Sequence, residues 1–282
     1  MSKVAVVGAG TMGNGIAHVF AQYGWDVSLV DLEPEALERA LKTIATNIER
    51  LVRKGVGSRE SGAGTLARIK ASTSFDAVKG AEILVEAATE NPKIKFEIFA
   101  TVSRLLAPDS ILASNTSSIS ITELAKHTNN PGRVIGMHFM NPVPVMTLVE
   151  IIRGKATSED TVSKTVAIAK ELGKTPVEVN DAPGFVSNRV LMPMINEAIF
   201  CVQDGIATPQ AVDEVMKLGM GHPLGPLALA DLIGLDVCLS IMRVLQDGLD
   251  KQKYRPAPLL EKMVTAGKLG RKSGQGFYAY RD

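Results

Sequence analysis

Hydrophobic and polar positions in the first two-thirds of the chain follow two alternating patterns. Short runs rich in valine and isoleucine predict strands, and the longer segments between them have the three-to-four-residue spacing of helices. The clearest predicted strands are residues 4–7, 27–30, 83–87, 111–114, 134–138 and 148–152. Strands that alternate with helices predict an α/β fold, here a Rossmann-type, doubly wound and mainly parallel sheet.

After Asp181 the strand pattern ends. The segments with helical spacing are residues 185–204, 209–218, 227–245 and 258–266. Thr208 and Pro209 predict a capped helix start, and Gly219 predicts the end of that helix. We therefore expect two domains, an α/β domain over residues 1–182 and an all-helical domain over residues 183–282, with a hinge in the Asp181–Gly184 stretch.

Composition excludes several classes of partner. The 282 residues include 31 Lys plus Arg against 30 Asp plus Glu, so a net charge of +1 predicts neither a nucleic-acid nor a membrane partner. Cys201 and Cys238 lack any metal-ligand spacing and are expected to be buried thiols, and no metal site is predicted. The start of the chain lacks a signal-peptide core, and a cytoplasmic location is expected.

A glycine-rich motif directly follows the first predicted strand. Its residues are Gly8, Ala9, Gly10, Thr11, Met12 and Gly13, and the second strand ends at Asp31. This spacing predicts a dinucleotide site in which the glycines allow close approach of a pyrophosphate and the carboxylate binds the adenosine ribose. A carboxylate there repels a 2′-phosphate, so NAD is favoured, although a flexible loop after Asp31 would allow NADP. The alternative is a purely structural glycine turn.

Two polar residues interrupt the last predicted strands. His138 ends one apolar strand, and its ordinary pKa suits a base that removes a hydroxyl proton. Glu150 lies within the apolar run 148–152, where an unpaired carboxylate is costly to bury. If the two strands are neighbours, the carboxylate orients the imidazole. The alternatives are a hydrogen-bonded core histidine and a glutamate that faces solvent at a sheet edge.

Short polar side chains mark two further candidate positions. Residues 114–118 follow a strand and place Asn115 and Ser117 at a carboxyl end, where ligands bind in open α/β sheets. The segment also fits a helix cap. Asn188 lies on the first turns of the helical domain, where its amide either reaches a substrate or is exposed.

The chain resembles the 3-hydroxyacyl-CoA dehydrogenase family over essentially its whole length, and is most similar to its short bacterial 3-hydroxybutyryl-CoA members. The strings that carry the resemblance are VGAGTMGNGIA from Val7, EAATEN from Glu86, SNTSSISIT from Ser114, GMHFMNPVPVMTLVEII from Gly136, DAPGFVSNR from Asp181, LGPLALADLIGLD from Leu224 and GRKSGQGFY from Gly270. The resemblance implies an enzyme that oxidises a short 3-hydroxyacyl thioester of coenzyme A with NAD, and a homodimer.

The resemblance also implies roles for matching residues. His138 matches the general base, Glu150 its paired carboxylate, and Ser117 and Asn188 the substrate hydrogen-bonders. Further cofactor contacts beyond the glycine motif and Asp31 are implied at Glu90, Lys95, Asn115, Asn141 and Lys272.

Coenzyme A contacts are implied on the helices after the second strand. Lys54 matches a lysine of the family, whereas Asn47 stands where the family has a serine. Arg50, Arg53 and Lys54 form a basic helical face suited to phosphates, although a solvated charged face has the same pattern.

Two rival functions share parts of this pattern. One is a hydroxyacid, sugar-acid or imine-reducing dehydrogenase, against which the pairing of His138 with Glu150 argues because such enzymes commonly use a lysine. The other is a non-catalytic protein that senses NAD. The apolar residues around 227–237 predict a helix buried on more than one side, as in a dimer interface or a monomer core.

Overall fold

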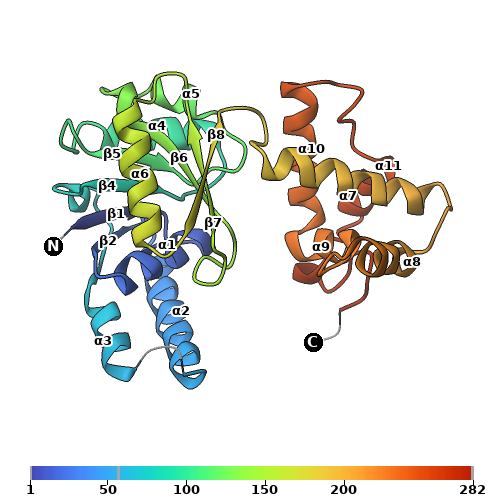
Figure 1. The fold of residues 1–282 in the computed structure, drawn as a ribbon, viewed down its shortest axis with the longest axis horizontal. Helices are drawn as coiled ribbons and strands as arrows, with labels where there is room; N and C mark the ends of the chain where they lie inside the picture. The colour runs from blue at the N-terminus through green and yellow to red at the C-terminus, as the bar shows by residue number, and fades with distance from the viewer. Residues whose placement is uncertain (1, 56–57, 281–282) are drawn as a thin grey trace. The chain divides into compact units, whose positions relative to one another are not determined.

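The computed structural model describes residues 2–55 and 58–280. The chain divides into two compact units, Met1–Asp181 and Ala182–Asp282, and each is described by itself (Figure 1). The structure confirms the predicted fold class, an α/β unit with a mainly parallel sheet followed by a helical unit.

Among the described residues, the strands of the first unit form one eight-stranded sheet in the order β3-β2-β1-β4-β5-β6-β7-β8. The strands are Lys3–Val7 (β1), Asp26–Val30 (β2), Ile69–Ser72 (β3), Ile83–Glu86 (β4), Ile111–Ser114 (β5), Val134–Phe139 (β6), Leu148–Arg153 (β7) and Thr175–Asn180 (β8). All neighbours pair in parallel except β6 and β7. Strands β3 and β8 were not among the clearest predicted strands, and β3 exposes half of its residues and β8 most of them.

Helices pack on both faces of this sheet (Figure 1). They are Thr11–Gln22 (α1), Pro34–Arg53 (α2), Arg59–Ala67 (α3), Pro92–Val102 (α4), Ile121–Ala125 (α5) and Glu159–Glu171 (α6). Because strand side chains alternate between faces, Val4 and Val6 of β1 point to the same face. They share one hydrophobic cluster with residues of α1, α2 and α6.

The strand order reverses at β1, which pairs with β2 on one side and with β4 on the other. In an open α/β sheet, the crevice beyond the carboxyl ends of two such strands is the place where ligands bind. The glycine motif follows β1, and residues 87–90 follow β4. The topology therefore brings these two segments to one crevice.

The second unit is built mainly of helices, with isolated β-bridges near its C-terminal end. Its helices are Ser187–Gln203 (α7), Pro209–Glu214 (α8), Pro226–Ile233 (α9), Leu235–Gly248 (α10) and Pro258–Thr265 (α11), with a π-helical turn at Val215–Gly219. The expected continuous helix over residues 227–245 is wrong. Gly234 has a φ of +105°, a conformation that α-helices exclude and glycine permits, so the segment divides into α9 and α10.

Two buried carboxylates hold the second unit together. Asp231 accepts hydrogen bonds from the backbone N–H groups of Phe277 and Tyr278 and from the Tyr280 hydroxyl, each at 3.0 Å. Asp213 accepts from the Tyr278 hydroxyl at 2.7 Å and from the first turn of α9. These bonds satisfy both carboxylates. They also hold the C-terminal segment 277–280 against α8 and α9.

His18 predicts a specific pH dependence of stability. It lies on α1 with 1% of its surface exposed, and burial lowers its pKa from 6.5 to about 4. The unfolded chain therefore binds a proton near pH 6.5 that the folded chain excludes. We expect the free energy of unfolding to fall by about 2.5 kcal/mol from this group between pH 7.5 and pH 4.5.

Urea unfolding of wild type and His18→Phe at these two pH values gives the loss of unfolding free energy for each protein. The contribution of His18 is the difference between the two losses. The exposed His127, replaced by glutamine, serves as the matched control and should behave as wild type. A His18→Phe protein that loses as much stability as wild type would show that other groups cause the loss.

Candidate active site

Two glycines of the motif after β1 are required by the protein itself. Gly8 has a φ of +99°, which favours glycine. A Cβ atom added to Gly13 would lie 1.7 Å from the carbonyl oxygen of Gly8. The turn and the close packing of α1 against it therefore exclude larger residues at both positions.

Gly10 differs, because nothing in the described protein explains why it is glycine. Its φ of −66° and ψ of −167° suit any residue, and an added Cβ would meet no atom within 4 Å. It is the N-cap of α1 and has no side chain to cap the first backbone N–H groups of that helix. The open space and the N–H groups together fit a pyrophosphate, which approaches the backbone closely and binds at a helix N-terminus.

Asp31 follows β2 and is held in one orientation. Its Oδ2 accepts from the backbone N–H of Ala9 at 2.7 Å, and its Oδ1 accepts from the N–H of Glu33 at 3.0 Å. The first bond ties the carboxylate to the glycine motif. Asp31 and the motif thus form one rigid element, as a ribose-binding carboxylate requires.

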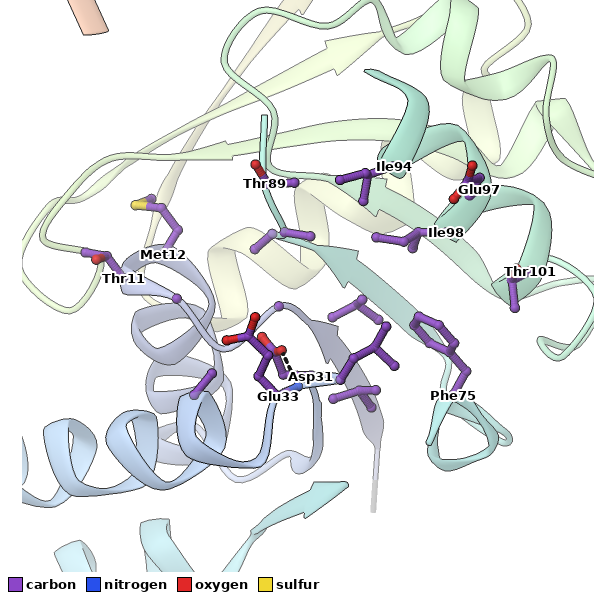
Figure 2. A pocket seen from close by; sticks show the side chains of 18 of the residues that line it. Thr11, Met12, Asp31, Glu33, Phe75, Thr89, Ile94, Glu97, Ile98 and Thr101 are labelled. Atoms are coloured by element: carbon purple, nitrogen blue, oxygen red, sulfur yellow. Dashed lines mark hydrogen bonds between the residues drawn. The ribbon is translucent and has the colours of Figure 1, made fainter. Parts of the chain in front are cut away.

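A cavity of about 760 Å³ opens beside this element. Figure 2 shows Asp31 and Glu33 on one wall and the α4 side chains Ile94, Ile98 and Thr101 on another. Both Gly8 and Gly10 line it. Its size and its mixture of apolar walls with a few fixed polar groups suit part of a dinucleotide.

His138 and Glu150 lie directly opposite each other on the antiparallel strands β6 and β7. The imidazole Nδ1 lies 2.8 Å from Glu150 Oε2. Their exposed fractions are 8% and 3%, so Glu150 does not face solvent at a sheet edge. Because the carboxylate binds Nδ1, it fixes the ring orientation and stabilises the protonated ring, and Nε2 is the nitrogen suited to exchange a proton with a ligand.

Asn115 and Asn141 follow the neighbouring strands β5 and β6. The side-chain oxygen of Asn115, directly after β5, accepts from the backbone N–H of Phe139 at 2.8 Å. That bond holds the backbone of Phe139, the residue that follows His138. Asn141 is exposed two residues beyond β6.

Glu90 is the centre of a hydrogen-bond network with the segment after β5. One of its oxygens accepts from the Thr116 hydroxyl at 2.6 Å, from the Ser117 N–H at 2.8 Å and from the Ser118 N–H at 3.0 Å. Burial raises the pKa of Glu90, but the charge of Lys95 and these hydrogen bonds outweigh it, so the pKa lies below its usual value. The carboxylate is therefore charged at neutral pH and orders the Ser117 loop.

Lys95 is buried in the structure, with 1% of its surface exposed. Its Nζ lies 2.7 Å from Glu86 Oε1 and 3.5 Å from Glu90 Oε2. Glu86 was not among the candidate site residues predicted from the sequence. Its position at the end of an apolar strand resembles that of Glu150 within one, and it could have indicated a buried carboxylate that needs a partner.

Asn188 and Lys272 belong to the second unit. Asn188 lies in the first turn of α7 and is 9% exposed, so the alternative of an exposed amide is wrong. The Lys272 ammonium donates to Asp236 at 2.7 Å.

The candidate coenzyme A residues lie on α2 and directly after it. Asn47 is half-buried in the helix, and Lys54 is an exposed C-cap residue. Arg50 and Arg53 are exposed in the last turn. The basic face exists as predicted, and its exposure is compatible both with phosphate binding and with simple solvation.

No described helix is long and apolar enough to span a membrane. The described residues also contain no group of three or more histidine, cysteine, aspartate or glutamate side chains arranged to hold a metal ion.

A dinucleotide crevice at the switch point and a histidine–carboxylate pair beyond it define a nicotinamide-dependent dehydrogenase. Residues 3–182 match the sequence pattern of the 3-hydroxyacyl-CoA dehydrogenase NAD binding domain, and residues 184–280 match that of the 3-hydroxyacyl-CoA dehydrogenase C-terminal domain. The chain belongs to the 3-hydroxyacyl-CoA dehydrogenase family, whose members are oxidoreductases that act on a CH–OH group.

Similar proteins cover the whole chain. A probable 3-hydroxybutyryl-CoA dehydrogenase of Bacillus subtilis is 56% identical over 100% of this chain and 98% of its own length. A 3-hydroxybutyryl-CoA dehydrogenase of Bradyrhizobium diazoefficiens is 50% identical over 100% and 96%. The crystal structure of (S)-3-hydroxybutyryl-CoA dehydrogenase from Ralstonia eutropha is 50% identical, covers 100% of both chains and has a TM-score of 0.97.

Proposed function

We propose that this enzyme catalyses the reversible NAD-dependent oxidation of (S)-3-hydroxybutyryl-CoA to acetoacetyl-CoA. The observation that carries the proposal is the buried pair of His138 and Glu150, 2.8 Å apart on the neighbouring strands β6 and β7 of the sheet that also carries the glycine motif. The names of the similar proteins support the substrate. A secondary alcohol that loses a hydride must also lose its hydroxyl proton, and the pair provides a base for that proton.

His138 is the proposed general base. Its Nε2 takes the hydroxyl proton as the C–H bond breaks, and the electron pair of the O–H bond forms the carbonyl. Glu150 stabilises the imidazolium that results. Hydride acceptance is the chemistry that NAD supplies when bound. In the reverse direction His138 returns its proton to the carbonyl oxygen.

Ser117 and Asn188 are the proposed hydrogen-bond donors to the substrate oxygen. A donor contributes most when it is already oriented before the reaction, because no rearrangement is then required as charge develops. The backbone of the Ser117 loop meets this condition, because Glu90 accepts from the N–H groups of Ser117 and Ser118. The Ser117 hydroxyl donates to Glu90 at 3.2 Å and must turn from Glu90 to donate to the substrate oxygen.

For the cofactor, we propose that the glycine motif and Asp31 bind the pyrophosphate and the adenosine ribose. Glu90, Asn115, Asn141 and Lys272 are proposed as further contacts by family resemblance. The resemblance also implies Lys95, which is 1% exposed and lies 3.5 Å from Glu90, so its proposed contribution to cofactor binding is made through Glu90. NAD is proposed over NADP because Asp31 is fixed by two backbone hydrogen bonds and cannot turn away from a 2′-phosphate without losing them. Its negative charge disfavours that phosphate.

For the thioester, we propose that Lys54 and Asn47 contact coenzyme A. Lys54 lies close in sequence to Arg50 and Arg53, and together they provide positive charge for phosphate groups. The polar Asn47 replaces a hydroxyl with an amide and so retains a hydrogen-bonding group.

The test is the loss of NADH absorbance with purified protein and acetoacetyl-CoA, compared with free acetoacetate, a long-chain 3-oxoacyl-CoA and NADPH in place of NADH. Rapid loss with acetoacetyl-CoA and NADH is the expected result. Activity only with the long chain would reassign the substrate, and faster reaction with NADPH would contradict the NAD preference. Activity with free acetoacetate, or with none of these substrates, would favour the rival functions.

We also propose that the enzyme is a homodimer formed through its helical unit. Large apolar side chains are exposed there, including Leu218 at 84%, Ile206 at 73% and Val190 at 68%. Where such side chains lie together on one face, they mark an interface. Sedimentation equilibrium should give twice the 30.1 kDa chain mass, and Leu218→Glu should shift it towards one chain mass. A wild-type monomer would contradict the proposal.

The location we propose is the cytoplasm. Cys201 and Cys238 are both unpaired, and burial raises the pKa of the Cys238 thiol to about 12, which keeps it unreactive. Thiol labelling of protein isolated under non-reducing conditions should detect Cys201 in the reduced state, and an oxidised Cys201 would contradict this location.

A further inference from the structure

A buried ionic group lies at the carboxyl ends of β4 and β5 and has no role in the reaction described above. Glu86, the last residue of β4, is 0% exposed. Its Oε1 accepts from the backbone N–H of Ala88 at 2.7 Å, and its Oε2 accepts from the Ser114 hydroxyl at 2.7 Å. Lys95 donates to both oxygens, at 2.7 and 2.8 Å. A carboxylate held by three different donors has one geometry available to it.

The same lysine connects Glu86 to the cofactor edge of the sheet. Lys95 Nζ is 3.5 Å from Glu90 Oε2, and the other oxygen of Glu90 accepts from the Ser117 N–H and hydroxyl, at 2.8 and 3.2 Å. A continuous set of contacts therefore runs from Glu86 through Lys95 and Glu90 to Ser117. It joins the segment after β4 to the segment after β5.

We propose that Glu86 is a positioning residue, which holds Lys95 and Glu90 and thereby fixes the segments 87–90 and 115–118 for cofactor binding. Lys95 then acts by keeping Glu90 in place, since its own ammonium is buried between two carboxylates. This inference rests on the proposed function, because the two segments matter only if the crevice binds a nicotinamide cofactor.

The charges explain why the group is ionic. Two carboxylates share one ammonium, so Lys95 is attracted to both and holds them at a fixed separation. Without Glu86, the lysine would lose its hydrogen bonds at 2.7 and 2.8 Å and would be drawn to Glu90 alone. Glu90 would then move, and the hydrogen bonds that it accepts from the Ser117 loop would weaken.

The test compares Glu86→Gln, Lys95→Met and the double variant by NADH fluorescence titration and thermal unfolding. Each single variant should lower Tm, and Glu86→Gln should raise the NADH Kd by about tenfold or more, because small displacements of positioning groups have large effects. The double variant removes both charges and should recover much of the Tm. Its NADH Kd should remain raised.

Two outcomes would overturn the inference. A double variant with wild-type NADH affinity would make the pair purely structural. Wild-type or tighter NADH binding by Glu86→Gln would mean that Lys95 contacts the cofactor directly and needs no carboxylate to place it.

If the charge variants fail to fold, a second pair of variants that each remove a serine hydroxyl tests the same proposal. Ser114→Ala removes a 2.7 Å hydrogen bond to Glu86 and the longer bond, at 3.3 Å, that Ser114 accepts from the Thr116 N–H. Ser110→Ala removes a bond of the same 2.7 Å length, to the carbonyl of Ala81, just before the start of β5. Only Ser114→Ala should raise the NADH Kd, by about threefold. Equal NADH affinity in these two variants would contradict the proposal.

The titration contains no acyl-CoA, so it separates this inference from the proposed substrate. Wild-type protein that binds NADH but does not reduce acetoacetyl-CoA would contradict the substrate alone. The Glu86 experiment would then still decide the role of the ionic group.

Discussion

Replacing His138 by glutamine should lower turnover of acetoacetyl-CoA by at least about a hundredfold, with little change in NADH affinity. Glutamine keeps a hydrogen-bonding group against Glu150 but cannot accept and release a proton at neutral pH. The effect should therefore fall on kcat. Initial rates at saturating NADH and an NADH fluorescence titration measure the two quantities separately.

The matched control is His127→Gln, which makes the same substitution at an exposed histidine that stacks on Phe96. It should leave kcat within about twofold of wild type, because ordinary surface substitutions have small effects. Turnover by His138→Gln close to that of His127→Gln would remove His138 from the role of base.

A second large effect is expected from two glycines of one motif, and it differs in kind between them. Gly13→Ala places a methyl group 1.7 Å from the Gly8 carbonyl oxygen, and we expect this variant to be destabilised by several kcal/mol, about the upper range for single substitutions. Gly10→Ala meets no protein atom, so its Tm should match wild type. Its NADH Kd should nevertheless rise by about tenfold or more, because the methyl group occupies the space for the pyrophosphate.

Thermal unfolding and NADH titration of the two variants decide between a binding motif and a structural turn. Gly24→Ala cannot serve as a control for Gly10→Ala. The φ of Gly24 is +92°, where an alanine would be strained, whereas the backbone angles of Gly10 suit any residue. Normal NADH binding by Gly10→Ala would mean that the glycine turn serves the fold alone.

The strands that a sequence reveals are those buried on both faces. Strands β1, β2, β4, β5, β6 and β7 are mostly apolar because helices cover both sides of the sheet. β3 and β8 lie at the two edges of the sheet, where solvent replaces a neighbouring strand and polar residues are tolerated. Their sequences, IKAS and TPVEVN, therefore resemble loops.

One physical rule predicted the pairing of His138 with Glu150, and the same rule was not applied to Glu86. A carboxylate in an apolar strand needs a partner, and that rule led from Glu150 to His138 on the next strand. It applies equally to Glu86, but its partner Lys95 lies on α4, and a pairing between a strand and a helix has no fixed register in the sequence. The break at Gly234 was missed because apolar periodicity continues across it while only the backbone angle changes.

The pairing of β6 with β7 has a consequence for engineering the enzyme. The proposed base and its carboxylate face each other because of strand register, and a slip of one residue would turn one of them to the opposite face. A library that seeks new acyl-chain preferences should therefore leave residues 134–139 and 148–153 unchanged. Variation outside these two strands would leave the proposed base and its carboxylate paired on an intact hairpin.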